Sequence, residues 1–570
     1  MRYFATKSKI MGNTVAATFD AIVIGSGISG GWAAMELCKK GLKTLLLERG
    51  RNVEHITDYG TANLNPWDFK FRLNKTDKEI QANPLRSQYA DESNKHFFAS
   101  DVDHPYVQEK PFSWVRGYQI GGRSLTWGRQ CYRLSDLDFE ANLKEGIAVD
   151  WPLRYKEIAP WYDYVEKFIG VSGRAEGLAH LPDGHFLPPM ELNCIENHLA
   201  DSIRKSDQNR LLTIARVANL TKNLDGRQPC KNRNLCSRGC PYGAYFSSNS
   251  STIPAAFETG NLTLRPYAIV SEILYDSKSQ KAIGVRIVDT LTGESFEYYA
   301  RIIFVNASTI ATTGLLLNST STRFPNGLGN DSGELGHNLM DHHSSAGAYG
   351  THEQFQDRYY KGRRPCGFII PRFRNLMPNS GLNFLRGYNI HGDGERQEWQ
   401  NSMEANGFGE SFKKHITTPG PWTVWMAAWG ECLPYKDNTV SLHATKKDKW
   451  GLPQIVIDFS FKDNEHKMMD DAMDTSQEML LAAGFKGVNS FNYRKPGGAT
   501  VHEMGTCRMG RDPKNSVLNG NNQLHAVNNV FITDGSCMTS SASQNPSLTY
   551  MALTARACDF AVKELKKGNI

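Results

Sequence analysis

Residues 19–50 read as a strand, a glycine-rich turn, a helix and a second strand. An apolar run over 19–24 gives way to the turn Gly25-Ser26-Gly27-Ile28-Ser29-Gly30. A helical pattern then ends at Gly41, and a second apolar run ends at Glu48. This order and spacing are those of a dinucleotide-binding βαβ unit, so the sequence predicts a Rossmann-type domain.

Each glycine of the turn, Ser29 and Glu48 has a specific structural role in such a unit. Gly25 permits the tight turn, Gly27 lets backbone N–H groups approach a pyrophosphate, and Gly30 lets the helix pack against the strand. Ser29 lies in the first helical turn, whose partial positive charge attracts phosphate. Glu48 is placed to accept hydrogen bonds from a ribose, and its acidity disfavours a 2′-phosphate. The alternative is an ordinary βα turn, and the motif does not separate NAD from FAD.

Bulk properties narrow the function classes. At 570 residues the chain is too long for one compact core, so two domains or one large elaborated domain are expected. Its 65 basic and 59 acidic residues are dispersed, and the net charge of +6 comes with no basic tract, which argues against nucleic-acid binding. No apolar run is long enough to span a bilayer, and residues 1–18 have no apolar core, so neither a transmembrane segment nor a secretory signal is expected.

The middle of the chain predicts further elements. Residues 51–110 are polar and irregular and suggest a lid or an oligomer contact. A helix is expected from Tyr155 onward, with a break at Pro160. Apolar runs predict strands, of which the first four resemble a meander and the last suits a parallel sheet: 262–266, 269–275, 282–289, 295–300 and 301–305.

A change in amino-acid composition and in hydrophobic pattern marks a second domain over 335–495. Aromatic residues cluster there, and hairpin-like alternation over 439–443 and 454–461 indicates a mostly antiparallel sheet that carries a substrate pocket. After 495 the chain returns to glycine-rich turns, strand and helix. The fold expected is therefore α/β, with a discontinuous Rossmann-type nucleotide domain over 15–334 and 496–570. The substrate domain, 335–495, is expected to hold a mostly antiparallel sheet backed by helices.

Segments near the end of the chain carry a family resemblance. HEMGTCRMG occupies 502–510, NVFITDG occupies 529–535, and SQNPSLTY at 543–550 precedes a helix. Together with the N-terminal unit, with GGRSLTWG at 121–128 and with SVLN at 516–519, these resemble the glucose–methanol–choline family of flavin oxidoreductases. The resemblance extends over nearly the whole chain and implies FAD rather than NAD.

The resemblance also assigns catalytic roles. A histidine in the family's HxxGTxRM segment faces the flavin, which implies that role for His502, and a second His or Asn before the closing helix corresponds to Asn545. Alcohol oxidation needs a base for the hydroxyl proton while hydride leaves the same carbon. A histidine suits that base, and Asn545 can hold the hydroxyl oxygen without competing for the proton. The bland alternative for His502 is a buried, hydrogen-bonded histidine in a turn.

Other positions are implied to contact FAD. Relatives of the pyranose oxidase type carry a histidine bonded covalently to FAD in the segment 121–128, where this chain has Thr126, so non-covalent FAD is expected. A simple glycine turn is the alternative for that segment. Beyond Gly25, Gly27, Ser29, Gly30 and Glu48, the cofactor-binding residues expected are Gly121, Gly122, Ser124, Thr126, Trp127, Val270, Asp534, Gly535, Asn545 and Pro546.

Within the family, the chain is most similar to bacterial sugar dehydrogenases, including glucoside 3-dehydrogenases, and to pyranose oxidases. The resemblance implies oxidation of a sugar or glycoside hydroxyl, at carbon 3 in the glucoside 3-dehydrogenases, with hydride passing to FAD. Trp422, Trp425 and Trp429 suit sugar stacking, although such clusters are more often core. The alternatives are a pyranose-oxidase-like enzyme that releases peroxide, and a non-catalytic flavin- or sugar-binding subunit.

Three cysteines, Cys230, Cys236 and Cys240, fall within eleven residues. Some dehydrogenases of this branch hold an iron–sulfur cluster on three cysteines, so a [3Fe-4S] centre relaying electrons is one expectation. Structural thiols or a zinc site are the others. The electron acceptor expected is a cytochrome, a quinone or a small carrier subunit. The remaining, isolated cysteines indicate a cytoplasmic protein, with export to the periplasm on a partner subunit's signal as the alternative.

Overall fold

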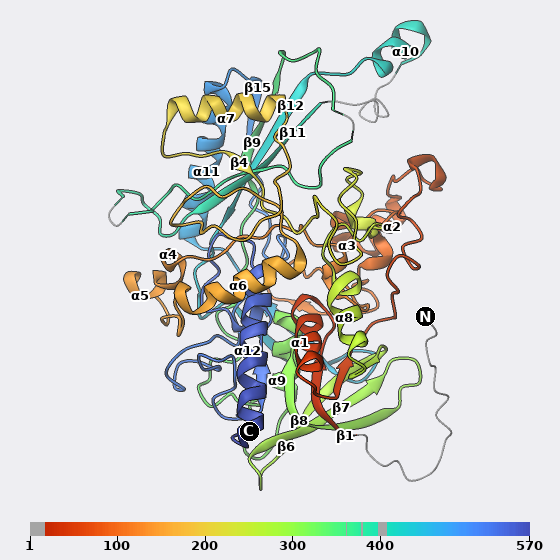
Figure 1. Cartoon of the computed structure of the whole chain (residues 1–570), viewed down its shortest axis with the longest axis vertical. Coiled ribbons are helices and arrows are strands. Elements are labelled where there is room, and N and C mark those ends of the chain that lie inside the picture. Colours follow the sequence, from red (N-terminus) through yellow and green to blue (C-terminus); the bar gives the residue numbers. More distant parts are fainter. Residues whose placement is uncertain (1–17, 361, 378–379, 397–406) are drawn as a thin grey trace.

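The structure, a computed structural model, describes residues 18–360, 362–377, 380–396 and 407–570. Its lower half in Figure 1 holds a seven-stranded sheet in the order β5-β2-β1-β8-β7-β6, with β16 also paired to β8. The strands are β1 (Thr18–Ile24), β2 (Thr44–Leu47), β5 (Leu262–Arg265), β6 (Ala268–Asp276), β7 (Lys281–Asp289), β8 (Ser295–Val305) and β16 (Val530–Ile532).

The predicted βαβ unit is the centre of this sheet. β1 and β2 pair in parallel, and α1 (Ile28–Lys39) connects them. The last four residues of β1 and all four of β2 are buried, which is typical of parallel strands covered on both faces. α1 packs between α8 (Ile253–Glu258) and the long C-terminal helix α12 (Ser547–Lys567), as Figure 1 shows.

The predicted meander was partly wrong. The run at 262–266 does not join it, because β5 pairs in parallel with β2 at the sheet's edge. The two runs at 295–300 and 301–305 form one strand, β8. Two different strands pair with separate parts of the same edge of β8. Residues 295–299 pair antiparallel with β7, and residues 303–305 pair in parallel with β16. A strand's apolar content predicts its burial but not its neighbours.

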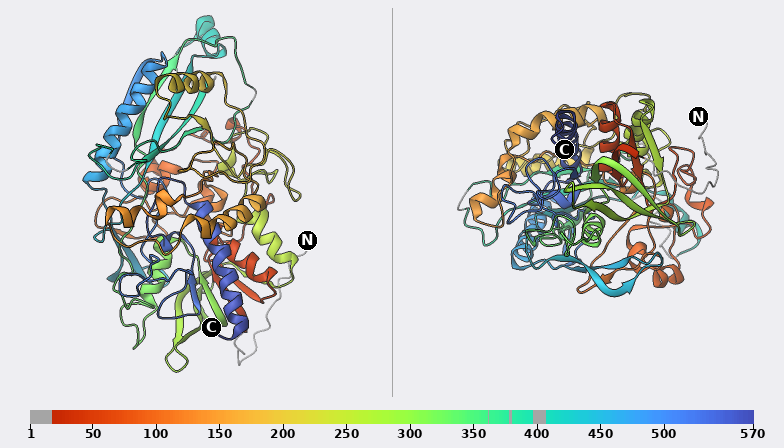
Figure 2. Two further views of the ribbon diagram at one scale, coloured as in Figure 1. Left: turned by 60° about the vertical axis from the view of Figure 1, so that its left-hand side comes forward. Right: turned by 90° about the horizontal axis from the view of Figure 1, so that it is seen from below.

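The upper half holds a six-stranded antiparallel sheet in the order β15-β9-β12-β11-β10-β4. α7 (Cys194–Ser206) and α11 (Asp463–Ala482) cover one of its faces, as Figures 1 and 2 show. The sheet's strands are β4 (Thr213–Ile214), β9 (Ala346–His352), β10 (Phe368–Ile370), β11 (Tyr388–Arg396), β12 (Trp422–Gly430) and β15 (Lys486–Asn492). The predicted fold class, a Rossmann-type α/β domain with a helix-backed antiparallel sheet, is confirmed.

Two details differ from expectation. The hairpin β13 (Thr439–Lys447) and β14 (Pro453–Asp458) forms a separate small sheet with β3 (Val107–Gln108) instead of joining the six-stranded one. The helix α6 (Tyr155–Ile169) continues through Pro160 without a break. Pro160 and Lys156, whose carbonyl loses its helical partner there, are both exposed, so water can satisfy that carbonyl.

The remaining helices are short and are given at the end of this paragraph. Among the described residues, no helix is long and apolar enough to cross a membrane. The remaining helices are α2 (Asp77–Ala82), α3 (Pro84–Tyr89), α4 (Asp136–Phe139), α5 (Ala141–Glu145), α9 (Thr309–Asn318) and α10 (Gly409–Thr417).

Candidate active site

The three glycines of the turn differ in what surrounds them. Gly25 has φ +92°, and a side chain there would meet the Asn306 carbonyl oxygen at 2.4 Å. A side chain on Gly30 would lie 1.8 Å from the Gly25 oxygen. A side chain on Gly27 would meet no atom within 4 Å. Gly25 and Gly30 are therefore required by packing alone, whereas Gly27 borders open space at the N-terminus of α1, where an anionic group would be stabilised.

Glu48 directly follows β2, beside this turn, and is buried. One carboxylate oxygen accepts hydrogen bonds from the backbone N–H (3.1 Å) and hydroxyl (2.6 Å) of Ser26, and the other accepts from the Gly50 N–H (2.9 Å). Burial raises the pKa of Glu48, and these hydrogen bonds oppose that rise. A carboxylate has about four acceptor sites, so Glu48 keeps capacity for a ribose hydroxyl.

The segment 121–128 lies against the same turn. The Gly121 N–H donates to the Ser26 hydroxyl at 2.9 Å, and a side chain on Gly122 would lie 3.5 Å from the Gly27 Cα. The Ser124 hydroxyl donates to the Gly121 carbonyl at 2.6 Å. The structure thus brings Gly121, Gly122 and Ser124 to the turn.

Thr126 and Trp127 lie in the loop that follows Leu125, and Val270 lies on β6. The Thr126 N–H donates to the Arg123 carbonyl (3.0 Å), and the Trp127 indole donates to the Phe246 carbonyl (2.8 Å). Val270, on β6, lines a cavity of about 100 Å³ together with Arg49, the neighbour of Glu48. This cavity is the candidate position for the adenine end of a dinucleotide.

Asp534 and Gly535 follow β16 and are fully enclosed. Asp534 accepts hydrogen bonds from Thr312 (2.5 Å) and from the backbone and hydroxyl of Ser536 (3.0 and 2.5 Å). The Gly535 carbonyl accepts from the Gly505 N–H at 3.0 Å, which ties β16 to the segment that carries His502. A side chain on Gly535 would lie 2.5 Å from the Glu503 carbonyl, so only glycine fits there.

His502 and Asn545 are brought together. The Asn545 amide nitrogen lies 3.5 Å from His502 Nε2, although 43 residues separate the two. The His502 backbone is held by Asp341, whose carboxylate accepts its N–H at 3.1 Å. Asn545 directly precedes Pro546, the N-cap residue of α12. The carbonyl oxygen of Asn545 and the hydroxyl of Tyr550 are buried without a hydrogen-bond partner in the described part of the chain, as expected of groups that await a ligand.

His342 is a residue that the sequence analysis missed. Its Nδ1 lies 3.0 Å from Nδ1 of His502, and its Nε2 lies 2.8 Å from the carbonyl oxygen of Ala542. Because a carbonyl only accepts, Nε2 of His342 carries the proton and its Nδ1 is an acceptor. Nδ1 of His502 must then be the donor between the two rings, which leaves a lone pair on Nε2 of His502, on the side of Asn545.

The surroundings keep His502 neutral. Its pKa lies well below the ordinary 6.5, chiefly because of burial and then because of the neighbouring His342, Arg123 and His391. The guanidinium of Arg123 is itself paired with Glu503 at 2.7 Å. At neutral pH the imidazole is therefore uncharged and ready to accept a proton. The run LGNDSGELGHNLMDHH at 328–343 could have drawn attention to His342, but nothing local in it indicates contact with His502.

Substitutions at His342 are expected to act through the tautomer of His502. His342→Ala removes the acceptor, so flavin reduction should slow by at least about tenfold, part of the roughly 10²- to 10⁴-fold that a positioned base contributes. In acid the rate should fall because His502 becomes protonated. The lowered pKa of His502 keeps this acid limb of the pH–rate profile below pH 6.5 in the parent protein. Without His342 the limb should move to higher pH. His342→Asn, which keeps an acceptor, is the control; an unmoved limb in the alanine variant would contradict this role.

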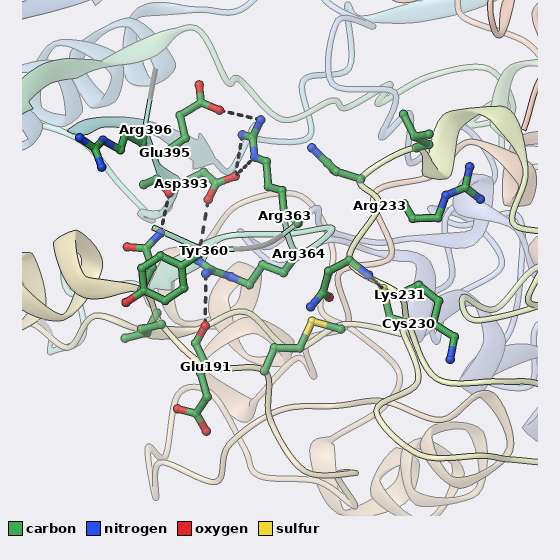
Figure 3. Close-up of a pocket in the computed structure, with 18 of the residues that line it drawn as sticks. Glu191, Cys230, Lys231, Arg233, Tyr360, Arg363, Arg364, Asp393, Glu395 and Arg396 are labelled. Atoms are coloured by element: carbon green, nitrogen blue, oxygen red, sulfur yellow. Dashed lines mark hydrogen bonds and ion pairs between the residues drawn. The ribbon is translucent and has the colours of Figure 1, made fainter. Parts of the chain in front are cut away.

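A further cavity lies apart from this site, and none of the site residues described above lines it. It measures about 1230 Å³, and Figure 3 shows Cys230, Lys231 and Arg233 on one side of it and Arg363 and Asp393 on the other. Arg363 and Asp393 form an ion pair at 2.8 Å. Of the cysteine trio, only Cys230 lines the cavity.

The cysteines are all free thiols. Burial raises the pKa of Cys230. Cys366, which the sequence analysis did not single out, is partly buried, and its thiol donates to the Gly128 carbonyl at 3.1 Å. Burial raises its pKa to about 11, with Cys236 adding to the rise. Among the described residues, no three His, Cys, Asp or Glu side chains are grouped to hold a metal ion. The iron–sulfur centre stays a prediction.

The three tryptophans of β12 divide between the two faces of the upper sheet. Trp422 is buried in the core beneath α7 and α11, which fits the core alternative, and it also lines the cavity of about 1230 Å³. Trp425 and Trp429 lie on the opposite face, and Trp429 contacts His391 with ring centres 4.6 Å apart. The alternation of a strand places residues 422 and 425 on different sides.

Comparison with known proteins gives the following matches. Family models described as GMC oxidoreductase match residues 200–344 and 434–554. A 2-methyl-1,2-propanediol dehydrogenase from Mycolicibacterium austroafricanum is 28% identical over 96% of both chains. The fructose dehydrogenase large subunit from Gluconobacter japonicus is 25% identical over 96% of this chain and 98% of its own. A solved structure of formate oxidase from Aspergillus oryzae superposes with a TM-score of 0.62 at 15% identity, over 97% of this chain and 100% of that one.

Proposed function

Since the chain belongs to the GMC oxidoreductase family and is an FAD-dependent oxidoreductase of CH–OH donors, we propose that it oxidises a sugar or glycoside hydroxyl to a ketone. Carbon 3 of a glucoside is the first position to test. The observation that carries the proposal is the partly buried, neutral His502, whose acceptor atom Nε2 faces the Asn545 amide nitrogen at 3.5 Å.

In this proposal the substrate hydroxyl gives its proton to Nε2 of His502. The amide of Asn545 holds the hydroxyl oxygen, which turns the carbon–hydrogen bond of the same carbon away from the base. FAD, held without a covalent bond, supplies the acceptor for the hydride that leaves that carbon. As the proton moves, His342 keeps the N–H of His502 on Nδ1, so Nε2 is the only ring position that can receive it.

The ADP part of FAD is assigned to the glycine-rich turn and its neighbours. Gly27 leaves space for the pyrophosphate, and Glu48 accepts from the ribose. Gly121, Gly122 and Ser124 line the approach to Gly27. Asp534 and Gly535 lie beside the His502 segment, where the ribityl chain would run. The open space and the unpartnered atoms of Asn545 and Tyr550 fit such a ligand.

For the second half-reaction we propose an external electron acceptor on a partner. One relative is named as the large subunit of fructose dehydrogenase, a name that implies a second subunit there. In this chain Cys230, Cys236 and Cys240 are the candidate ligands of a [3Fe-4S] centre, and the cavity that Cys230 lines is the candidate docking point. A cytoplasmic location, or a periplasmic one reached with that partner, belongs to the same proposal.

The decisive measurement is an anaerobic absorption spectrum of the purified protein before and after addition of methyl β-glucoside. Bleaching of the flavin bands is expected, because hydride transfer reduces FAD. Product analysis then identifies the oxidised carbon. Flavin bands that persist with glucosides but bleach with other alcohols would overturn the substrate class.

The same spectrum tests the cysteine trio. A cluster would add a broad absorption beneath the flavin bands, and Cys236→Ser would remove it while FAD stays bound. Cys194→Ser, a partly buried cysteine far from the trio in the sequence, is the matched control. A spectrum with flavin bands alone, and one mole of FAD but no iron, would reject the cluster.

A further inference from the structure

The face of the six-stranded sheet that α7 and α11 leave uncovered carries a group of aromatic side chains beside the active site. Tyr349 and Trp425 lie directly opposite each other on β9 and β12, and their exposed fractions are 44% and 43%. Phe491 on β15 lies opposite Gly347, and Tyr493, which is 64% exposed, follows that strand. We call Tyr349, Trp425, Phe491 and Tyr493 the aromatic platform; Figure 1 labels the strands that carry it.

Ring contacts make the platform one surface. Trp425 and Phe491 lie nearly parallel, with ring centres 6.5 Å apart and planes at 9°, and Phe491 and Tyr493 stack at 4.9 Å and 15°. Tyr349 contacts Phe491 at 6.5 Å. Phe491 is 8% exposed because Trp425 and Tyr493 pack against it, so the accessible rings are those of Tyr349, Trp425 and Tyr493. The row of the sheet next to Tyr349 and Trp425 carries the small residues Gly347 and Ala427, which pair with each other.

The platform continues to the catalytic histidine. Trp425 contacts Trp429 at 6.3 Å, and Trp429 contacts His391 at 4.6 Å. His391 is one of the groups that lower the pKa of His502. In the row of the sheet next to His391, the Asn389 amide donates to the Ser543 carbonyl at 2.8 Å, two residues before Asn545. The path from reaction centre to platform therefore runs along one sheet face.

His391 is itself ready for a ligand. It is 3% exposed, yet neither ring nitrogen has a hydrogen-bond partner in the described part of the chain. Burial lowers its pKa to about 3, so the ring is neutral, with one donor and one acceptor. Neighbouring hydroxyls of a sugar ring supply the complementary acceptor and donor. A buried unpaired imidazole is costly unless such a partner arrives.

From this geometry we propose that the aromatic platform is a second binding subsite, which holds the ring next to the sugar being oxidised. It rests on the proposed function and narrows its substrate class to glycosides with a second ring. His391 and Phe491 are three strand spacings apart, about 14 Å, which leaves room for a ring beyond the one at His502. The exposed aromatic rings of Tyr349, Trp425 and Tyr493 suit a planar aromatic aglycone or the CH face of a second pyranose, and Asp393, opposite Trp425, can accept from a sugar hydroxyl.

The test measures affinity without turnover. In holoenzyme carrying His502→Ala, titration calorimetry compares methyl β-glucoside, phenyl β-glucoside and cellobiose. The two-ring ligands should bind about tenfold more tightly than methyl β-glucoside. Trp425→Ala and Tyr349→Ala should each remove most of that advantage. Phe257→Ala, on α8 and 41% exposed, is the matched control and should leave the ratio unchanged. Phenyl glucoside and cellobiose separate an aglycone site from a sugar site.

Equal affinities for one-ring and two-ring ligands, or an advantage that survives both variants, would overturn the proposal. The platform variants should also leave the oligomeric state unchanged. A change of state with equal affinities would show that a second copy of the chain covers the platform. If two-ring ligands bind tightly but do not reduce the flavin of the parent protein, the subsite is supported and the proposed function is rejected. Failure of the subsite and failure of the proposed function therefore give different results.

Discussion

Replacing His502 with alanine should reduce the rate of flavin reduction by about 10²- to 10⁴-fold, the contribution of a positioned general base. His342 does not replace it, because His342 turns its proton-bearing Nε2 to the Ala542 carbonyl and its Nδ1 to His502. The measurement is stopped-flow reduction of the flavin under anaerobic conditions, with the substrate that bleaches the parent.

The control for this variant must separate chemistry from folding. FAD content and the thermal unfolding midpoint should match the parent, because the His502 side chain holds no backbone element in place. Raising the pH should recover part of the rate in His502→Ala, since hydroxide can take the proton in place of the base. A variant that reduces its flavin at the parent rate would remove His502 from the mechanism.

Replacing Gly27 with alanine should abolish FAD binding while the polypeptide still folds. The backbone at Gly27, with φ −67° and ψ −161°, is extended and open to alanine, and the new methyl group would meet no protein atom within 4 Å. It would occupy the space through which backbone N–H groups reach a pyrophosphate. Flavin content after purification, and unfolding with and without added FAD, measure the effect.

Substitutions at two other glycines serve as comparisons for this test. Gly60→Ala, which also meets no atom within 4 Å, should keep its flavin. Gly30→Ala would force a carbon to 1.8 Å from the Gly25 oxygen and should fail to fold. In Gly27→Ala the lost ligand also lowers apparent stability, by about 2.7 kcal/mol where free FAD is a hundred times its dissociation constant. A Gly27→Ala protein with a full complement of FAD would contradict the assignment.

The βαβ unit could be predicted from the sequence because its turn chemistry is local. Gly25 and Gly30 are dictated by contacts within or beside the turn, and the burial of β1 follows from its apolar run. The same local reasoning failed at Pro160, where exposure lets water satisfy the freed carbonyl and the helix continues. It also failed for β5, because pairing partners depend on the whole sheet.

The sequence predicted two residues of the candidate site, but it did not predict the third. His502 and Asn545 carried a family motif, and the structure brings them together. His342 lies 160 residues from His502, and they meet because Met340 and Met504 pair in an isolated bridge, a contact that no periodicity predicts. The different faces of Trp422 and Trp425 were readable from strand alternation, once β12 was recognised as a strand.

The shared edge of β8 has a consequence for how the protein is made. β16 pairs with the edge of β8 that faces away from β1, yet it is synthesised some 225 residues after β8. At about 5–20 residues per second, this edge of β8 waits roughly 11–45 s for β16, and α1 waits roughly 25–100 s for α12. During that interval an apolar strand edge and the buried face of α1 are exposed to other chains. We expect the nascent chain to depend on chaperones, and the cofactor to be acquired only after translation has passed α12.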